Sequence, residues 1–202
     1  AGEYAEGLGG NFQRAVQSSL DAYPQGTFVQ IAVADAEGRM VFSSLERHGK
    51  PLAGVSIRDR EHFQVHARQQ AQGLFVGRPV RGRVSQEWTI QLSRGLYRDG
   101  RFIGVLVLSV SPDYIGRYFH TLFEHTDDVV VLVREDGAYL ARSQGQDAGL
   151  GQFVPPERVQ LFGPGQRQGT YETVATVDGV ARLYAWRRVE GYPVIVSTGL
   201  ER

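Results

Sequence analysis

The strongest constraint on the fold of this chain is a turn signal that recurs between runs of alternating apolar residues. In FVQIAVADAEGRMVFSS, an acidic residue and a glycine, Asp35 and Gly38, separate two such runs. The signal recurs at later turns: Asp99-Gly100, Asp136-Gly137, Asp178-Gly179 and Glu190-Gly191. Glycine accepts the positive φ that tight hairpin turns require, so each signal predicts two antiparallel strands. The chain is therefore predicted to be built largely from β-hairpins.

The order of the predicted elements occurs twice along the chain. The first half has a hairpin at 28–44, a helical segment, IRDREHFQVHARQQA, and then the strands LFVGRPV, EWTIQLSRGLY and RFIGVLVLSV. The second half has a hairpin at 128–143, a short helical piece around PPERVQLF, and then the strands GTYETVATV, VARLYAWRRV and YPVIVSTG. A five-stranded antiparallel sheet with helices between its second and third strands, present twice, accounts for this order.

A helix is predicted ahead of the first hairpin. Apolar residues recur there at four-residue intervals from Leu8 to Leu20, which puts them on one face of a helix that Pro24 closes. This face packs on the core or, as the alternative, projects towards a membrane or a partner subunit. We therefore expect an α+β fold with a long N-terminal helix over 1–26 and two modules, 27–120 and 121–202.

Composition narrows the classes of function. The 202 residues include no cysteine, which excludes a disulfide scaffold, a thiolate zinc site and a cysteine nucleophile. The formal net charge is zero, and this argues against a general nucleic-acid binder. No apolar run approaches the roughly 20 residues that cross a bilayer. Phosphate-binding loops and a nucleophile elbow are also missing, so we expect this piece of a longer protein to have no cofactor and to catalyse no reaction.

Positive charge is concentrated in one part of the chain. Between Ser56 and Arg101 there are nine arginines and four acids, a formal charge of +5 within a chain that sums to zero. Arginine presents a planar fork of donors that binds a carboxylate or phosphate through two parallel hydrogen bonds. Such a cluster either is a solvated surface or surrounds a negatively charged ligand. Arg68, Arg98 and Arg101 are assigned to the solvated surface.

The remaining arginines and their neighbours form the candidate binding site. The helical segment places Arg60 and His66 near one face, and period-two alternation places Trp88 and Arg94 on one face of the fourth strand. Guanidinium groups that converge with a hydroxyl and an aromatic wall suit a small carboxylate-like anion. The candidate ligand-binding residues from this cluster are Arg60, His66, Arg78, Arg83, Ser85, Trp88 and Arg94. The alternative is that Arg60 pairs with a neighbouring acid, Arg94 faces solvent and Trp88 belongs to the core.

Three segments of the first half have a recognisable pattern. VSIRDREHFQVHA contains the helix start DR-x-x-F-x-x-H. LFVGRPVRGRVSQEWTIQLSRGL forms the strand pair that follows it, and RDGRFIGVLVLSVSPDYIGRYF contains a closing strand and an aspartate-containing exit. Over about residues 28–119 these motifs resemble the double Cache family, the PAS-like sensor modules of bacterial membrane receptors, and most of all those attached to diguanylate cyclases. The second half is similar to that family in the order of its elements.

The resemblance implies a periplasmic ligand-sensing domain between two transmembrane helices, with a diguanylate cyclase or histidine kinase as the cytoplasmic output. It implies two stacked PAS-like modules, of which the first binds the ligand and the second transmits the change. It also adds Asp113, at the position of the family's closing aspartate, to the ligand-binding residues. The tyrosine of the family's amino-acid-binding pattern is not evident, which favours another small anion. The expected partners are a small anionic ligand, the membrane through flanking helices, and a second copy of the chain in a homodimer, without nucleic acid.

Two other interpretations remain open. His62 and His66 have the H-x-x-x-H spacing that can place two imidazoles on one metal ion, with His48 or Glu87 as a third ligand. The residues between them lack the glutamate that zinc hydrolases use as general base, so we expect no metal. The second interpretation is a structural spacer or dimerisation module, which leaves the arginine cluster without a role.

Overall fold

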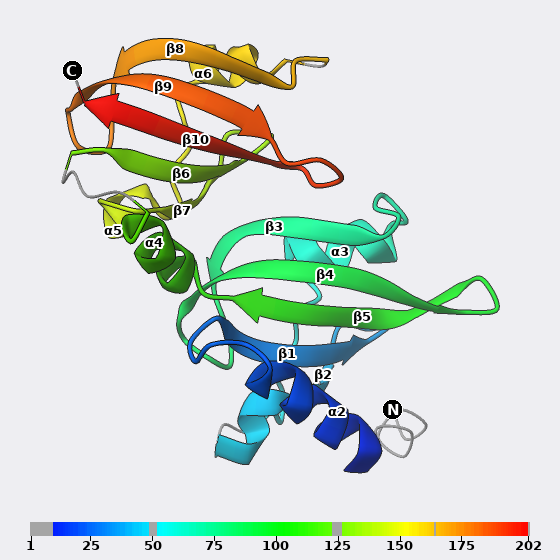
Figure 1. Ribbon diagram of the computed structural model, residues 1–202. Coiled ribbons are helices and arrows are strands. Elements are labelled where there is room, and N and C mark those ends of the chain that lie inside the picture. The colour runs from blue at the N-terminus through cyan, green and yellow to red at the C-terminus, as the bar shows by residue number, and fades with distance from the viewer. Residues whose placement is uncertain (1–9, 49–51, 123–126, 164, 202) are drawn as a thin grey trace. The chain divides into compact units, whose positions relative to one another are not determined.

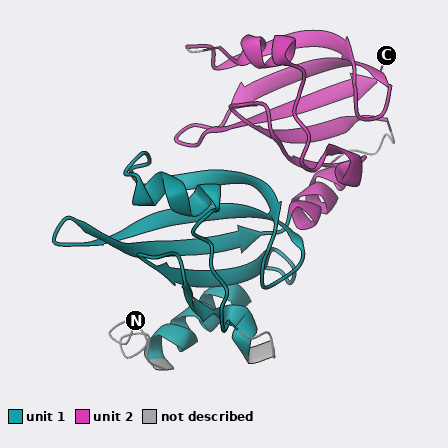
Figure 2. Ribbon diagram, turned by 180° about the vertical axis from the view of Figure 1, so that it is seen from behind, with its two compact units in different colours: residues 1–111 teal, residues 112–202 magenta. Residues whose placement is uncertain are grey.

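The computed structural model has two compact units, residues 1–111 and 112–202 (Figure 2). The structure describes residues 10–48, 52–122, 127–163 and 165–201. Each unit has its own five-stranded antiparallel sheet and its own core. An α+β fold with two such sheets is what the repeated order of elements predicted, and that prediction is confirmed.

The sheet of unit 1 has its strands in the order β2-β1-β5-β4-β3, so β5 is central and pairs with both β1 and β4 (Figure 1). The strands are β1 (Phe28–Asp35), β2 (Met40–Ser43), β3 (Leu74–Arg81), β4 (Trp88–Arg98) and β5 (Arg101–Val110). The register between β3 and β4 shifts between Val76 and Pro79. Proline cannot donate a ladder hydrogen bond, and an edge strand with an irregular register accommodates it.

Helices cover both faces of this sheet. They are α2 (Gly10–Asp21), the 3-10 helix η1 (Ser44–His48) and α3 (Glu61–Ala67). Phe63 of α3 packs in a core cluster with Ala34 of β1, whereas Val16 of α2 packs in a different cluster with Val33. Successive side chains of a strand point to opposite faces, so these two residues of β1 serve two cores. Figure 1 shows α3 behind the sheet and α2 beside β1 and β2.

Unit 2 repeats the same strand order as β7-β6-β10-β9-β8. Its strands are β6 (Val129–Arg134), β7 (Tyr139–Arg142), β8 (Gln168–Val174), β9 (Ala181–Arg188) and β10 (Val194–Glu201). Its helices are α4 (Pro112–His120), α5 (Gln146–Gly149), α6 (Pro156–Val159) and the 3-10 helix η2 (Gln160–Phe162). The core of unit 2 is rich in aromatic rings, among them Tyr139, Tyr184, Trp186 and Phe162.

The turn after the first strand is built alike in both units. Gly38 and Gly137 have φ values of 81° and 90°, in the left-handed region that favours glycine. A Cβ at Gly38 would lie 2.7 Å from Cα of Arg58, and one at Gly137 would lie 2.7 Å from Cγ2 of Val159. Both turns therefore require glycine for backbone conformation and for space, as the acid-glycine signal predicted.

Part of the expected N-terminal helix is seen as α2. Residues 1–9, over which the helix was also expected, lie outside the described part of the chain. The apolar face of α2 packs on the core of unit 1, the first of the two alternatives for this helix. The helix α4, which follows the sheet of unit 1 in the chain, belongs to unit 2 by its contacts. Among the described helices, none combines the length and apolar character needed to span a bilayer.

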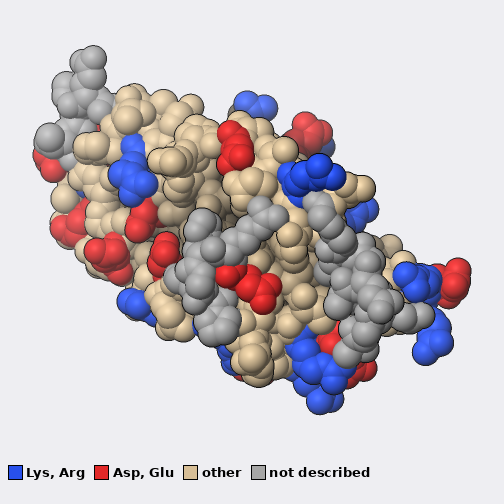
Figure 3. Space-filling model, turned by 90° about the horizontal axis from the view of Figure 1, so that it is seen from below, with Lys and Arg blue, Asp and Glu red and all other residues tan. Residues whose placement is uncertain are grey.

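Charged side chains of both signs are interspersed among uncharged ones on the face drawn in Figure 3. The formal net charge of the chain is zero. The face drawn therefore lacks the broad field of one sign with which proteins attract the nucleic-acid backbone.

Candidate functional site

A small cavity of about 30 Å³ lies in unit 1, over the face of the sheet that α3 covers. Strands β1, β4 and β5 form its floor, and residues just before α3 and in the turn between β3 and β4 form its rim. A water molecule needs about 10–15 Å³ of such volume, so the cavity as it stands holds about two waters. A larger guest requires the rim to move outward.

The floor of the cavity is a row of buried, uncharged polar side chains. Gln30, Gln91 and Ser109 are each at most 5% exposed and come from β1, β4 and β5. The Ser109 hydroxyl donates to Oε1 of Gln91 over 2.9 Å, and Nε2 of Gln91 donates to the hydroxyl of Thr89 over 2.6 Å. Nε2 of Gln30 donates to the hydroxyl of Ser43 over 2.7 Å. A sheet face that packs against a helix is normally apolar, so this polar row makes the cavity a candidate site for a polar ligand.

Arg60 and Arg83 lie at the rim of the cavity, and Arg81 lines it as well although its guanidinium lies over Trp88. Nη2 of Arg60 donates to the carbonyl oxygen of Arg81 over 3.2 Å. Arg83 donates to the carbonyl oxygen of Ser56 and, over 2.6 Å, to Oδ2 of Asp59. These contacts tie the β3–β4 turn to the segment that precedes α3. Because both partners of the ion pair are well exposed, it is worth at most about 1 kcal/mol, and the rim can open at low cost.

The contact with Arg83 changes the pKa of Asp59. Burial acts to raise the pKa of Asp59, but the hydrogen bond from Arg83, the local backbone and the charges of Arg83 and Arg60 outweigh it. The pKa of Asp59 is therefore lowered from its usual value, and the carboxylate is charged at neutral pH. Asp59 acts as an internal anion for one of the rim arginines.

His62 lies at the edge of the same cavity and is 6% exposed. Burial, then the charges of Arg60, His66 and Arg83, lower the pKa of His62 to about 4. The imidazole is therefore neutral at pH 7, with one ring nitrogen that donates and one that accepts. Within the described residues, no hydrogen-bond partner of the His62 ring is found.

The structure brings two of the sequence-predicted residues together at the cavity, Arg60 and Arg83. Ser85 is buried in the same turn, where its hydroxyl accepts from the backbone N–H of Glu87 over 3.3 Å. It packs against Gly82, a cavity residue, and does not itself line the cavity. Arg78 is exposed on β3 at the register shift and is also outside the lining.

The predicted face of β4 requires a correction. Gln91 lines the cavity and Ser93 contacts α3, so by alternation Trp88 and Arg94 point to the opposite face of the sheet. Arg94 is exposed there, and Trp88 is partly buried beneath the guanidinium of Arg81, which lies 5.7 Å from the ring centroid. The alternative assignment, a solvated Arg94, describes this side chain correctly.

His66 and Asp113 also lie away from the cavity. His66 is fully buried in the core, where its Nε2 is 3.0 Å from the hydroxyl of Ser93 and its Nδ1 has no partner within the described residues. Burial lowers the pKa of His66, although the contact with Ser93 opposes this. Asp113 is exposed in the first turn of α4 and belongs to unit 2. Of the two histidines, the one that lines the cavity is His62.

Sequence reasoning missed the cavity floor and His62. The signal for the floor was present in WTIQLSRG, where threonine, glutamine and serine alternate with apolar residues. Alternation identifies two faces but not which of them is buried, and the apolar set was taken as the inner one. Both His62 and His66 are buried.

The metal interpretation gains no support from the described residues. No group of three or more histidine, cysteine, aspartate or glutamate side chains within them could hold a metal ion. The side chain of His48 lies outside those described.

Unit 2 contains a larger hollow, a groove of about 1310 Å³ near Phe153, Pro156 and Arg188. The guanidinium of Arg188 already donates to Glu135 and to the carbonyl oxygens of Gln166 and Phe162. The guanidinium of Arg188 therefore already has hydrogen-bond partners within the protein, and it offers little to a ligand in this groove. The smaller cavity of unit 1 is therefore the better candidate site.

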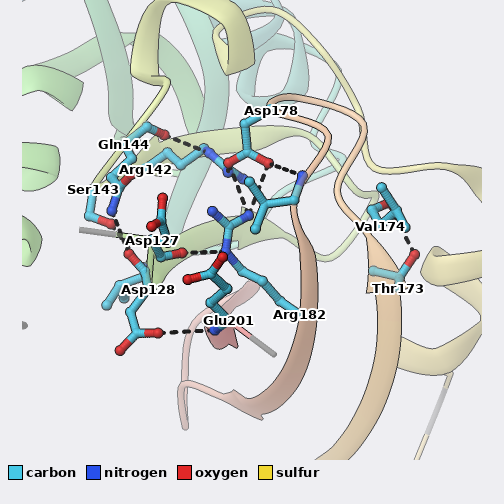
Figure 4. A network of polar contacts seen from close by, with 12 residues as sticks. Asp127, Asp128, Arg142, Ser143, Gln144, Thr173, Val174, Asp178, Arg182 and Glu201 are labelled. Atoms are coloured by element: carbon cyan, nitrogen blue, oxygen red, sulfur yellow. Dashed lines mark hydrogen bonds and ion pairs between the residues drawn. The ribbon is translucent and has the colours of Figure 1, made fainter. Parts of the chain in front are cut away.

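Two buried guanidinium groups of unit 2 share an internal anion (Figure 4). Arg142 and Arg182 are at most 2% exposed, and both are ion-paired with Asp178. Burial acts to raise the pKa of Asp178, but the hydrogen bonds from Arg182 and the Val180 N–H and the charge of Arg142 lower it overall. This network compensates the charges of both guanidinium groups within unit 2.

Solved structures with the same fold were found, whereas no family model and no curated protein matches the chain. The extracellular domain of the predicted histidine kinase rpHK1S-Z16 has a TM-score of 0.79 and 24% identity, over 99% of this chain and 83% of that one. The ligand-binding domain of the amino-acid chemoreceptor PctB of Pseudomonas aeruginosa PAO1, in complex with L-Arg, has a TM-score of 0.67 and 16% identity, over 99% and 82%. The sensor domain of the V. cholerae histidine kinase DctB has a TM-score of 0.60 and 12% identity, over 95% and 77%.

The fold is that of extracellular sensor domains. At these identities the likeness establishes the fold, while the nature of the ligand depends on the site of this chain. The link to diguanylate cyclases that the sequence motifs implied is not among these three likenesses, whose signalling proteins are histidine kinases and a chemoreceptor.

Proposed function

We propose that this chain is the extracytoplasmic ligand-sensing domain of a membrane-anchored signalling receptor, and that unit 1 binds a small anionic ligand in the cavity beneath the β3–β4 turn. The output of the receptor is a histidine kinase or a diguanylate cyclase. The chain itself catalyses no reaction. The observation that carries the proposal is a polar cavity in a core position with Arg60 and Arg83 at its rim.

Arg60 is the best-placed group for the anion. It is partly buried beside the cavity, and within the described residues its guanidinium makes one hydrogen bond, to a neutral carbonyl oxygen. A guanidinium has five donors, so Arg60 retains capacity for a carboxylate. The domain of PctB, with the same fold, was solved with L-Arg, which carries a carboxylate.

Ligand entry requires the β3–β4 turn to move. Arg83 holds this turn closed through Asp59 and Ser56, and a ligand carboxylate can replace Asp59 as the partner of Arg83. The ligand thereby favours a conformation in which the turn has shifted over it. A ligand changes a receptor only through such a difference in affinity between two conformations.

Unit 2 is the transmitting unit in this proposal. The interior face of its sheet is filled by aromatic side chains, and its two most deeply buried arginines, Arg142 and Arg182, are paired with Asp178. A densely packed unit with internally compensated charge passes on a displacement as a rigid body, because packed interiors transmit strain.

A thermal-shift and calorimetric screen of small organic acids and amino acids tests the proposal. We expect one class of acid to raise the melting temperature of the native chain and to lose this effect in Arg60→Ala. Arg94→Ala is the matched control, since it removes the same charge from the same sheet on the face away from the cavity. The control should respond as the native chain does.

Two results would overturn the proposed function. One is the absence of any acid that binds at millimolar concentration. The other is an equal loss of response in Arg60→Ala and Arg94→Ala, which would mean that general surface charge, and not the cavity, attracts the acid. The structural-spacer interpretation would then be the better account.

A further inference from the structure

The cavity is lined by uncharged polar side chains as well as by arginines. On the floor, the hydrogen bonds of Gln91 and Ser109 are made largely with each other and with Thr89. Two other buried groups that line the cavity have capacity left, namely Oε1 of Gln30 and the ring of His62. Within the described residues, no group donates to that oxygen and none pairs with that ring.

Unpartnered polar groups of this kind need a partner in the cavity. Gln30 is 5% exposed and His62 is 6% exposed, so bulk water reaches neither of them freely. A buried polar group without a hydrogen bond is unfavourable, which makes an occupant with matching groups favourable. Gln30 offers an acceptor, and the neutral His62 ring offers one donor and one acceptor. A hydroxyl group, which both donates and accepts, matches this pair.

The charge of the lining decides between a hydroxyl and an ammonium group. The described residues that line the cavity include Arg60, Arg81 and Arg83 and no aspartate or glutamate. Asp59 pairs with Arg83 outside the lining. An ammonium group placed here would meet positive charge with no carboxylate to compensate it. The lining therefore disfavours an α-amino acid and accepts an uncharged group beside the carboxylate.

We propose that the ligand class of this cavity is a small hydroxycarboxylate. Its carboxylate binds the guanidinium groups of Arg60 and Arg83, and its hydroxyl binds His62 and Oε1 of Gln30. His62 and Gln30 are then the residues that determine specificity. This inference rests on the proposed function, because it names the ligand of the same site. The small volume of about 30 Å³ favours acids of two or three carbon atoms, which need the least outward movement of the β3–β4 turn.

Matched series of acids test the inference by calorimetry at pH 7. In the series glycolate, acetate and glycine, and in the series lactate, propionate and alanine, the group beside the carboxylate changes while the carbon skeleton stays the same. We expect the hydroxy acid of each series to bind about tenfold more tightly than the unsubstituted acid or better, the size expected for one hydrogen bond to buried partners. The amino acid of each series should bind most weakly.

Variants assign the discrimination to residues. Gln30→Met keeps the length of the side chain and removes the amide, and His62→Phe removes the imidazole but keeps a ring. Each should reduce the ratio between hydroxy acid and unsubstituted acid severalfold while acetate or propionate still binds. Arg60→Ala should weaken both acids by the same factor. A circular-dichroism melt of each variant shows that it is folded, and the two variants test the floor independently.

The outcomes separate this inference from the proposed function. Equal affinity for glycolate and acetate, or an unchanged ratio in both variants, overturns the hydroxycarboxylate inference and leaves an anion sensor. Tighter binding of glycine or alanine than of the hydroxy acids overturns the argument from charge, again with the sensor retained. Failure of every acid to bind overturns both.

Discussion

In unit 1, β-sheet pairing aligns Gln30 with Ser109 and Ser109 with Gln91. In unit 2 the corresponding row is Val129, Gly199 and Tyr184. The correspondence follows from the turns, since Gln30 and Val129 each lie eight residues before the turn glycine of their unit. Two residues further along the first strand of each sheet, a second row is aligned. It consists of Ala32, Val107 and Ser93 in unit 1. In unit 2 it consists of Val131, Ser197 and Trp186.

The side chains of these rows fill the two interiors differently. In unit 2, Tyr184 lies over Gly199, where a Cβ would be 2.5 Å from Cε1 of the ring. Tyr184 stacks on Tyr171 at 5.0 Å between centroids, and Trp186 meets Phe162 edge-on at 5.1 Å. In unit 1 the same positions carry short or amide side chains, and the cavity lies above them. The same backbone thus supports a solid core in one unit and a polar cavity in the other.

The two units also differ in how their arginine charges are compensated. The guanidinium groups of Arg142 and Arg182 in unit 2 are buried and share the carboxylate of Asp178. The rim arginines of unit 1 are partly exposed, and Arg60 has no carboxylate partner within the described residues. The two most deeply buried arginines therefore have an internal anion, whereas Arg60, partly buried beside the cavity, has capacity for an external one.

The largest expected effect comes from Asp178→Asn. This change leaves two buried guanidinium groups without an anion, and we expect it to lower the free energy of unfolding of unit 2 by about 3–5 kcal/mol. Each unit contains one of the two tryptophans, so fluorescence of a Trp88→Phe background reports unit 2 alone. Asp147→Asn, an exposed change in the same unit, is the control. A loss below about 1 kcal/mol would mean that the network does not hold the unit together.

The second prediction places in unit 2 the residue that unit 1 has at the corresponding position of its sheet. Tyr184→Gln gives unit 2 the side chain that unit 1 has at Gln91, and it removes a ring that is 3% exposed. We expect a loss of about 3 kcal/mol in the free energy of unfolding of unit 2, because the aromatic core loses its stacking partner and gains a void. Denaturant titration in the same fluorescence background measures it. A loss near zero would contradict the picture of a solid core.

The third prediction concerns pH. The pKa of His62 is about 4 in the folded protein, below the ordinary value of 6.5, so the unfolded chain binds more protons between these values. The stability of unit 1 therefore falls as the pH drops through this range, by about 2 kcal/mol between pH 7 and pH 5 from His62. His66, whose pKa is also lowered, acts in the same direction. Denaturation of a Trp186→Phe background at the two pH values measures the change.

The control for this prediction is His62→Gln, which should remove the contribution of His62 and leave that of His66. The stability of unit 2 depends on pH over a different range. The pKa of Asp178 is lowered from 3.8, so its contribution is fully present above that pH and is lost only as the pH falls further. Equal sensitivity of both units between pH 7 and pH 5, unchanged by His62→Gln, would remove this difference between them.

The smallest expected effect is that of Gln30→Met on stability. The variant loses one hydrogen bond, to Ser43, and gains apolar contact, so we expect the free energy of unfolding of unit 1 to change by less than about 1 kcal/mol. Denaturant titration in the Trp186→Phe background checks this value. A loss above about 2 kcal/mol would make the polar row a structural element of unit 1 instead of a binding surface.

Much of the fold could be predicted because its signals are local. The acid-glycine turns act through the conformation of one residue, as the φ values of Gly38 and Gly137 show. The candidate site could be predicted only in part. Arg60 and Arg83 meet at one cavity because a helix start and a hairpin turn lie together, and the concentration of arginine in the sequence pointed to both.

The remainder of the site depended on contacts between distant segments. Alternation in β4 separates Trp88 and Arg94 from Gln91 and Ser93, but which set faces the cavity is decided by where α3 packs. Likewise, Arg142 is paired with Asp178, which lies 36 residues away in the sequence.

The sequence by itself determined two repeats of a twisted antiparallel sheet, because turn conformation and strand alternation are properties of neighbouring residues. The tertiary structure decided which repeat is solid and which is hollow, and which arginines have an internal anion. These outcomes depend on the volumes and charges that meet across a sheet, and such meetings are set by packing.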